Sequence, residues 1–126
     1  MNSKKLGDFG EAIAEIFLKN KGYRILDKNY SLIISGPKQG EIDIIAKKGD
    51  VISFIEVKTL ASEKIILPEE KVDRLKLRKI IKTAKSWLMK NKIPLDNKWQ
   101  IDVIAIRIDT VNKKAKMRHF KNAAFW

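Results

Sequence analysis

The sequence contains no cysteine, only one histidine and only three prolines. Without cysteine the chain can form neither a disulfide framework nor a zinc site built on thiolates, and it has no thiol nucleophile. Any metal ion must therefore bind oxygen ligands or the imidazole of His119. A lone histidine is more often a hydrogen-bonding residue than a ligand, so oxygen ligands are favoured.

Long apolar runs are also missing. No stretch approaches the roughly eighteen apolar residues that a membrane-spanning helix needs, and the start, MNSKKLGDFGEAIAEIFL, is charged where a signal peptide is apolar. We therefore expect no membrane association and a cytoplasmic location. The chain has 126 residues, 44% of them hydrophobic, which is enough for one core, so we predict a single domain over residues 1–126.

Acidic residues are few beside basic ones: 27 Lys and Arg against 15 Asp and Glu give a formal net charge of +12. Such a charge on a small domain favours a polyanionic partner, with nucleic acid, most simply DNA, as the first candidate. A lysine-rich proteome or growth at high temperature is the competing explanation. Between residues 71 and 92 the only acid is Asp73, and the basic residues there are Lys71, Arg74, Lys76, Arg78, Lys79, Lys82, Lys85, Lys90 and Lys92.

Hydrophobic spacing predicts two helices. The first is expected over residues 4–21, where apolar residues recur every three or four positions at Leu6, Phe9, Ile13, Ile16 and Phe17. The second is expected over residues 69–91, with a buried face formed by Val72, Leu75, Ile80, Ala84, Trp87 and Leu88.

Short β-rich runs fill the rest of the chain. They lie at 23–26, 30–34, 41–46 and 51–59, and then at 100–108 and 115–120. The first runs look like consecutive antiparallel strands. The resulting order, α-β-β-β-α-β-β, predicts an α/β fold in which helices flank a mixed β-sheet.

Charged residues interrupt two strands whose other residues are suited to burial. Asp43 lies within IDIIA, and Glu56 and Lys58 lie within ISFIEVKTL, although Asp and Glu are poor strand formers. If residues 48–49 form the tip of a tight hairpin, Glu41 lies opposite Glu56. Because side chains alternate along a strand, these four charged side chains would then emerge from one face.

The same register places Asp43 opposite Phe54 and makes Asp43 and Glu56 diagonal neighbours, about 7–8 Å apart at Cα. Like charges on a partly apolar face repel, and a divalent cation removes that penalty. Oxygen ligands favour Mg²⁺, with Mn²⁺ as the other choice, and one Asp with one Glu is enough for a hydrated Mg²⁺. We therefore assign Asp43 and Glu56 as metal ligands and Glu41 as an additional acid. Lys58 would orient the attacking water and offset charge on the phosphate.

The competing interpretation is a salt-bridge ladder on a solvated sheet face, which the spacing alone favours equally. A three-residue loop in the hairpin would scatter the four side chains onto two faces. Glu11 belongs to a stripe of small residues in the first helix, formed with Gly7, Gly10 and Ala14. Such a stripe permits close packing on the sheet or close approach of a ligand, and Glu11 can reach the metal site from there.

Several motifs together resemble a known family. They are Gly10-Glu11 near the start of the first helix, G-E-I-D-I-I-A, F-I-E-V-K, a helix carrying Lys76, and I-D-V-I-A-I. In this combination the chain, from about residue 5 to its end, resembles the YraN-type bacterial family (UPF0102). That family is similar to archaeal Holliday-junction resolvases and to the PD-(D/E)xK nucleases, so the resemblance implies a restriction-endonuclease-like three-layer core.

The resemblance also implies roles for individual residues. Glu11 matches the helical acid of the nuclease core, Asp43 matches the strand aspartate, and Glu56 with Lys58 matches the E-x-K element. Lys76 matches a lysine of the second helix, and we expect it to point toward the active face.

At two positions where the family pattern often has an arginine, this chain has an uncharged residue. Gln100 opens the strand that usually reads R-F-D-V-V, and Leu60 stands where an arginine often follows E-V-K. Asp102 matches the aspartate of that late strand, and we assign it a structural role because a buried carboxylate needs a hydrogen-bond partner, here a backbone donor or a lysine.

Together these features predict a Mg²⁺-dependent endonuclease that cleaves DNA, with branched or junction DNA as the implied substrate. Lys58 and Glu11 would be the catalytic residues. Phosphate contacts are assigned to Arg74, Lys76, Arg78, Lys79 and Lys82. The alternatives are a non-catalytic nucleic-acid-binding module on the same fold and, less favoured, a protein-interaction adaptor. A homodimer is expected only by analogy with resolvases, which cut two equivalent strands.

Overall fold

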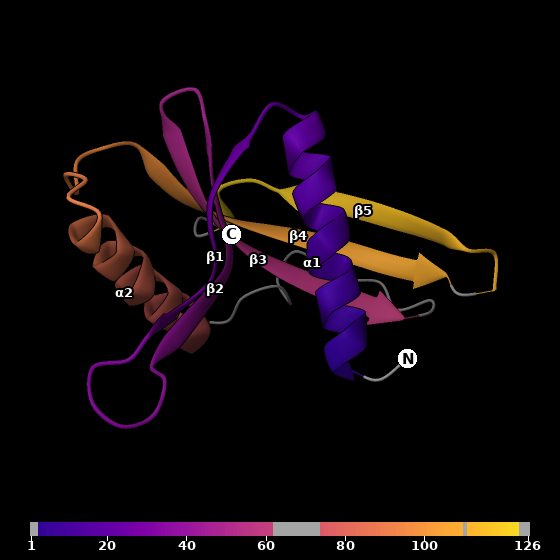
Figure 1. Ribbon diagram of the computed structural model, residues 1–126, viewed down its shortest axis with the longest axis horizontal. Coiled ribbons are helices and arrows are strands. Elements are labelled where there is room, and N and C mark those ends of the chain that lie inside the picture. The colour runs from indigo at the N-terminus through magenta and orange to yellow at the C-terminus, as the bar shows by residue number, and fades with distance from the viewer. Residues whose placement is uncertain (1–2, 62–73, 110, 124–126) are drawn as a thin grey trace.

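Two helices and five strands make up most of the chain in the computed structural model, which describes residues 3–61, 74–109 and 111–123 (Figure 1). The elements in chain order are α1 (Ser3–Asn20), β1 (Arg24–Leu32), β2 (Gly40–Lys48), β3 (Val51–Ala61), α2 (Arg74–Lys90), β4 (Trp99–Asp109) and β5 (Lys114–Phe120). The predicted order α-β-β-β-α-β-β is confirmed. The predicted helical residues 69–73 lie outside the described part of the chain.

The strands form one mixed sheet in the order β1-β2-β3-β4-β5. Neighbouring strands are antiparallel except β3 and β4, which run parallel over ten paired positions from Ile52–Trp99 to Ala61–Ile108. A parallel pair needs a crossover connection, and α2 lies within that connection. The predicted mixed sheet is therefore confirmed, and its one parallel pair has antiparallel pairs on both sides.

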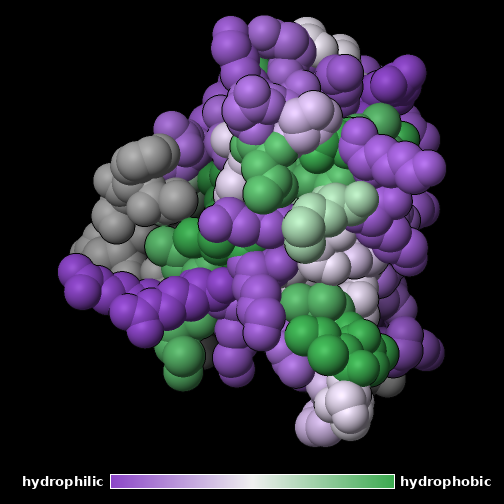
Figure 2. Space-filling view, turned by 90° about the vertical axis from the view of Figure 1, so that its left-hand side faces the viewer, coloured by the Kyte–Doolittle hydropathy of each residue, from purple (hydrophilic) through white to green (hydrophobic). Residues whose placement is uncertain are grey.

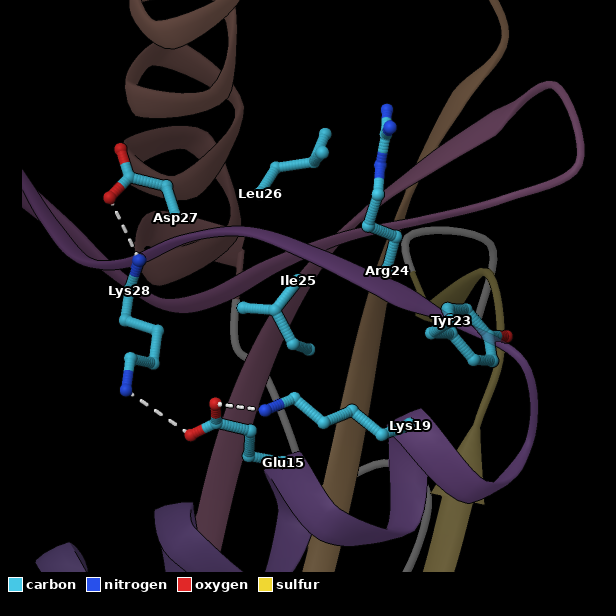
Figure 3. Close-up of a pocket in the computed structure, with 8 residues that line it drawn as sticks. All are labelled: Glu15, Lys19, Tyr23, Arg24, Ile25, Leu26, Asp27 and Lys28. Atoms are coloured by element: carbon cyan, nitrogen blue, oxygen red, sulfur yellow. Dashed lines mark hydrogen bonds and ion pairs between the residues drawn. The ribbon is translucent and has the colours of Figure 1, made fainter.

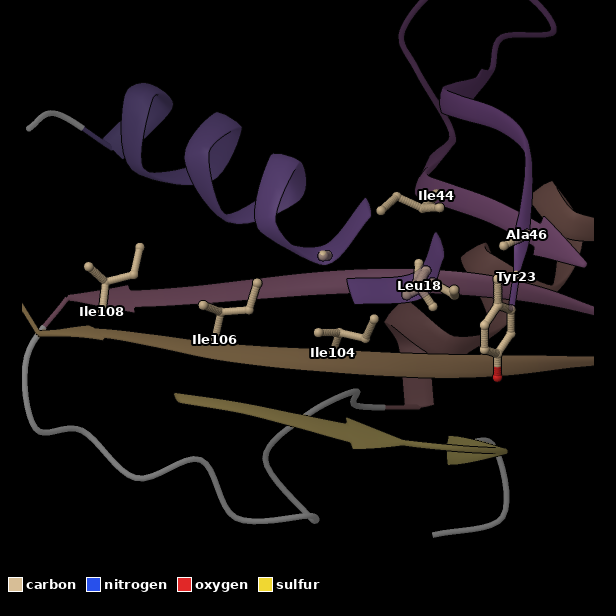
Figure 4. Close-up of a cluster of buried hydrophobic side chains, with 9 residues drawn as sticks. Leu18, Tyr23, Ile44, Ala46, Ile104, Ile106 and Ile108 are labelled. Atoms are coloured by element: carbon tan, nitrogen blue, oxygen red, sulfur yellow. The ribbon is translucent and has the colours of Figure 1, made fainter. Parts of the chain in front are cut away.

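Each face of the sheet has its own hydrophobic core, because the side chains of the central strands alternate between two helices. On one face α1 covers a cluster that includes Leu18, Ile44 and Ile104 (Figure 4). On the other face α2 covers a cluster that includes Phe54 and Trp87, whose rings meet edge to face with centroids 5.8 Å apart. Helix, sheet and helix form the three layers that the sequence predicted.

The predicted buried faces of the helices are partly wrong. Phe9 and Ile16 of α1 are 45% and 62% exposed, and Leu75 of α2 is 66% exposed. In α1 the buried residues are Gly10, Ala14 and Leu18, because the helix approaches the sheet along its line of small residues and leaves large side chains at the margins. The α2 prediction is confirmed at Ile80, Ala84, Trp87 and Leu88, all of which are buried.

Two local features of the first strands also differ from expectation. The runs predicted at 23–26 and 30–34 are one continuous strand, which includes a register shift between Ile25 and Asp27 and a left-handed Asn29 with φ of 51°. A bulge and a left-handed residue let one strand turn its side chains without breaking the ladder. The tip of the second hairpin is Gly49-Asp50, because Lys48 pairs directly with Val51. Among the described residues, neither helix is long and apolar enough to span a membrane.

Candidate metal centre

Asp43 and Glu56 come together where the β2–β3 ladder ends. The last paired residues are Ile44 and Ile55, and Asp43 and Glu56 follow them on the two strands. Asp43 Oδ2 accepts a hydrogen bond from the backbone N–H of Val57 at 2.8 Å, so its carboxylate caps the end of the ladder. The two acids are therefore adjacent cross-strand neighbours.

The predicted register is wrong, since Phe54 pairs with Ile45 and does not lie opposite Asp43. The physical reason is the turn, whose position at residues 49–50 moves every pairing by two residues along the partner strand. An even shift leaves each side chain on its original face. The acids on β2 and β3 therefore still share one face of the sheet, as predicted, although the pairing itself was predicted wrongly.

The Asp43 carboxyl is hard to ionise. Burial is the largest cause and raises its pKa from 3.8 to about 6, while the hydrogen bond from Val57 lowers the pKa. The neighbouring charges of Glu56 and Glu41 also contribute to this raised pKa, and the charge of Lys76 opposes them. Asp43 thus lies in a partly desolvated, negatively charged place, which a cation would stabilise.

Glu56 has one compensated oxygen and one uncompensated oxygen. Its Oε1 forms an ion pair with the ammonium of Lys76, as expected for a lysine that faces the acids. Its Oε2 is buried and has no hydrogen-bond partner, and the side chain as a whole is 15% exposed. A buried carboxylate oxygen without a partner is costly, and it marks a position suited to a positive ligand.

Helix α1 brings a third acid toward this pair. The pKa of Glu11 is raised from 4.5 to about 7, first by burial and then by the charge of Asp43, with smaller contributions from Asp8 and Glu41. The close approach depends on Gly10, where a Cβ atom would lie 1.8 Å from Thr59 Oγ1 on β3. No other residue type fits there without a shift of the helix, so the tight-packing interpretation of Gly10 is confirmed.

Helix α2 lies on the other side of the acid pair, and its close approach to the sheet also depends on a glycine. A Cβ atom on Gly40 would lie 2.0 Å from Thr83 Oγ1, whose hydroxyl donates to the carbonyl of Lys79 at 2.6 Å. Sequence reasoning did not select Gly40, although a glycine that opens a strand just before an acid is a signal for close backbone approach. The result is a cleft of about 430 Å³ lined by Gly40, Glu41, Asp43, Glu56, Leu75, Lys76, Lys79 and Ile80.

The remaining predicted residues lie around this cleft. Glu41 is half exposed and is held by Lys38 at 2.8 Å. Lys58 lies two residues beyond Glu56 on β3 and pairs with Ala105 of β4. Of the predicted phosphate contacts, Lys76 and Lys79 line the cleft, and the exposed Arg74, Arg78 and Lys82 lie along α2.

Figure 2 shows the side of the molecule that carries α2, where hydrophilic residues surround separate hydrophobic areas. This is the surface on which the sequence predicted phosphate contacts. Lys82 also donates to Gln39 Oε1 at 3.0 Å, which ties the helix to the segment before β2.

The donor set fits a hydrated cation better than one enclosed by protein ligands. Within residues 3–61, 74–109 and 111–123, no three Asp, Glu or His side chains lie close enough to hold a metal ion together. Two carboxylates are nevertheless sufficient for Mg²⁺, which keeps several of its waters. The free Oε2 of Glu56 and the second oxygen of Asp43 are hard oxygen donors of the right kind.

A larger hollow of about 700 Å³ lies between α1 and β1 (Figure 3). Its two carboxylates already have partners, since Glu15 forms ion pairs with both Lys19 and Lys28. Asp27 accepts from the backbone N–H of Lys28 and from the indole of Trp87. This hollow therefore lacks the unpartnered carboxylate oxygen that distinguishes the acid cleft.

Asp102 is fully buried on β4 and has the structural role expected of it. Its Oδ1 accepts from Gln100 Nε2 and from the backbone N–H of Asn122, both at 2.9 Å, and its Oδ2 lies 2.8 Å from His119 Nε2. The partners include the backbone donor that was anticipated, and none of them is a lysine. His119 is accordingly a hydrogen-bonding residue.

The sequence was also compared with known proteins. The family described as "Uncharacterised protein family UPF0102" matches residues 10–106. A UPF0102 protein of Alkaliphilus oremlandii is 41% identical over 121 residues, which is 96% of this chain and 98% of its own. A UPF0102 protein of Clostridium tetani is 42% identical over 127 residues, which is 98% of each chain. A UPF0102 protein of Clostridium acetobutylicum is 38% identical over 121 residues, which is 96% of this chain and 94% of its own.

Proposed function

This chain belongs to the uncharacterised protein family UPF0102, and we propose that it is a metal-dependent endonuclease that hydrolyses phosphodiester bonds in DNA. Membership confirms the YraN-type resemblance that the motifs indicated. The observation that carries the activity is the buried, unpartnered Oε2 of Glu56 beside an Asp43 whose pKa is raised to about 6. Two desolvated carboxylates in contact with one cleft are stable together when a cation lies between them.

In this proposal Asp43 and Glu56 hold Mg²⁺, or Mn²⁺ in its place. When bound, such an ion polarises a phosphodiester and activates water for attack on phosphorus. Asp43 lines the cleft, and the hydrogen bond from the backbone N–H of Val57 to its Oδ2 holds the carboxylate in place. Lys58, on the same face as Glu56, offsets negative charge that builds on the phosphate.

Glu11 supports the reaction as an acid–base residue. Its pKa of about 7 lies near neutral pH, where a carboxyl group exchanges protons most effectively. The close contact between Gly10 and Thr59 fixes the helix that presents Glu11, so its distance from the acid pair is set by backbone packing.

The substrate class follows from the charge of the chain. Exposed basic residues on α2 lie beside the cleft and suit contacts with backbone phosphates, which position a nucleic acid without reading its sequence. Branched or junction DNA is the preferred substrate in this proposal, with cleavage by a symmetric dimer in the cytoplasm. Two equivalent strands at a junction call for two equivalent sites.

The decisive test compares Asp43→Asn with wild type. Calorimetric titration of Mg²⁺ and Mn²⁺ should show binding to wild type and none to the variant, and only wild type should nick branched DNA. Asp50→Asn is the matched control, because Asp50 lies in the β2–β3 turn and pairs with Lys98 far from the cleft. If wild type binds no metal either with or without DNA, the proposal that this protein is a metal-dependent nuclease is wrong.

One observation favours a second candidate, a non-catalytic DNA-binding module. The ion pair between Lys76 and Glu56 already supplies a positive charge to one acid of the cleft. A module that relies on this pair would bind DNA through α2 and cleave nothing. Gel retardation by both wild type and Asp43→Asn, with no cleavage by either in Mg²⁺ or Mn²⁺, would select the module.

A further inference from the structure

Basic residues also lie on the sheet beyond the acid pair, in two rows of paired residues that cross from β3 to β5. Lys58 on β3 pairs with Ala105 on β4, and Ala105 pairs with Arg118 on β5. The next row runs from Leu60 through Arg107 to Lys116. Residues that pair directly in a sheet point to the same face, so each row presents its side chains together.

These rows share the face of Glu56 and lie opposite α1. Glu56, Lys58 and Leu60 alternate by two along β3. The intervening residues of β4, Ile104 and Ile106, belong to the core under α1. The basic rows therefore continue the surface that carries Glu56.

Helix α2 covers only the other half of this face, since it packs against β2 and β1 (Figure 1). Lys116 and Arg118 are exposed, and Arg107 is partly exposed. The guanidinium of Arg118 lies over the ring of Phe120, 4.9 Å from its centroid, which gives this cation a fixed place on the sheet.

Acidic residues do little to neutralise this surface. Among the described residues of β3, β4 and β5, the acids on this face are Glu56 and Asp109. Asp109 accepts hydrogen bonds from the backbone N–H groups of Val111 and Asn112 and from the Asn112 side chain, and these occupy its carboxylate in the turn. The hydrogen bond from the Asn112 side chain is the largest cause that lowers the pKa of Asp109, and the charge of Arg107 makes a smaller contribution. The structure gives Lys116 no carboxylate partner in the described part of the chain.

We propose that Arg107, Lys116 and Arg118 form a basic strip that binds backbone phosphates of duplex DNA on the side of the acid pair away from α2. This inference rests on the proposed function and extends it to the path of the substrate. Neighbouring strands are about 4.8 Å apart, so the strip begins within about 10 Å of Lys58. DNA bound at the cleft thus meets cations on both sides, α2 on one and the basic strip on the other.

The test measures how duplex DNA binding depends on salt, in EDTA so that nothing is cleaved. Each phosphate contact contributes about 0.9 to the slope of log affinity against log salt, so Arg107→Gln with Lys116→Gln should reduce the slope by about 1.8. Arg24→Gln with Lys47→Gln is the matched control, because it removes another cross-strand Arg–Lys pair at the far end of β2. The control should leave the slope unchanged.

Two further measurements keep the result interpretable. Arg107→Lys with Lys116→Arg keeps both charges and should restore the wild-type slope, and thermal unfolding verifies that each double variant is folded. Equal losses in the test and control pairs, or an unchanged slope in the test pair, overturn the basic strip. If the slope changes as expected while wild type cleaves no DNA in Mg²⁺ or Mn²⁺, the result supports DNA binding by the basic strip and contradicts the proposed nuclease activity. No binding by wild type overturns both.

Discussion

Asp102 and Glu56 occupy adjacent central strands, and their surroundings are opposite in character. Asp102 is fully buried and meets three donors, from Gln100, His119 and Asn122. Glu56 meets one cation, Lys76, while its Oε2 is buried without a partner and Asp43 lies beside it. A strand carboxylate whose oxygens all meet donors stabilises the fold, whereas one with an unpartnered oxygen beside a second carboxylate is suited to a ligand from outside the chain.

The largest effect should come from Asp102→Ala. Removing this carboxylate leaves the donors of His119, Gln100 and Asn122 without their acceptor, so the free energy of unfolding should fall by about 3 kcal/mol. Urea denaturation followed by circular dichroism measures the change. A loss below about 1 kcal/mol would show that the donors find other partners and would break the comparison.

The next effect is the pH dependence caused by Asp43. Its pKa is about 6 in the folded protein against 3.8 for the ordinary carboxyl, so the folded state binds the proton more tightly. The associated stability is present below about pH 4 and is lost as the pH rises through about 6, a change of up to about 3 kcal/mol.

Asp43→Asn removes this titration, so the difference in unfolding free energy between wild type and variant isolates it. Without divalent ions, wild type should lose stability relative to the Asp43→Asn variant between about pH 4 and about pH 7. Added Mg²⁺ should reduce the loss at neutral pH because it stabilises the ionised acids. Parallel pH profiles for the two proteins would contradict the raised pKa.

A smaller effect tests the packing that presents Glu11. Gly10→Ala places a methyl group against Thr59 and should lower stability by about 1–3 kcal/mol. Gly7→Ala is the control in the same helix, where nothing lies within 4 Å of the added Cβ, and it should raise stability by up to about 1 kcal/mol. Thermal unfolding of both variants gives the comparison, and equal shifts would argue against the close approach.

The smallest effect on stability should come from Glu56→Gln. Its ion pair involves a lysine that is 48% exposed, and solvent screening limits the loss to less than about 1 kcal/mol. Mg²⁺ binding should nevertheless disappear in calorimetry. If the variant is strongly destabilised, or if it still binds Mg²⁺ as wild type does, Glu56 has a structural role like that of Asp102.

Sequence reasoning predicted the acid cleft because its signals were local. Asp43 and Glu56 interrupt apolar strands, and alternation by two kept them on one face although the hairpin tip was misplaced. The distances between α1 and the acids could not be derived, because they depend on the contact of Gly10 with Thr59. The unpartnered Oε2 of Glu56 likewise depends on packing that no spacing rule describes.

The rest of the fold divides in the same way. The order of elements and the mixed sheet follow from hydrophobic periodicity and the crossover through α2. The exposure of Phe9 and Ile16 does not follow, because periodicity finds the apolar stripe but not which edge of it the sheet covers. Two of the three donors to Asp102, His119 and Asn122, come from β5 and the residues after it, and such long-range contacts cannot be read from a local pattern.

Strand β5 is an edge of the sheet, and its outward charges have a consequence for self-association. An open edge exposes unpaired backbone groups that can recruit a strand from another copy, and lysines on such an edge oppose this. Two copies that joined β5 to β5 would bring Lys114, Lys116 and Arg118 of each against the same residues of the other. The edge at β1 carries both signs, with Asp27 next to Lys28, so edge-to-edge repulsion is weaker there and an assembly by strand pairing would use β1.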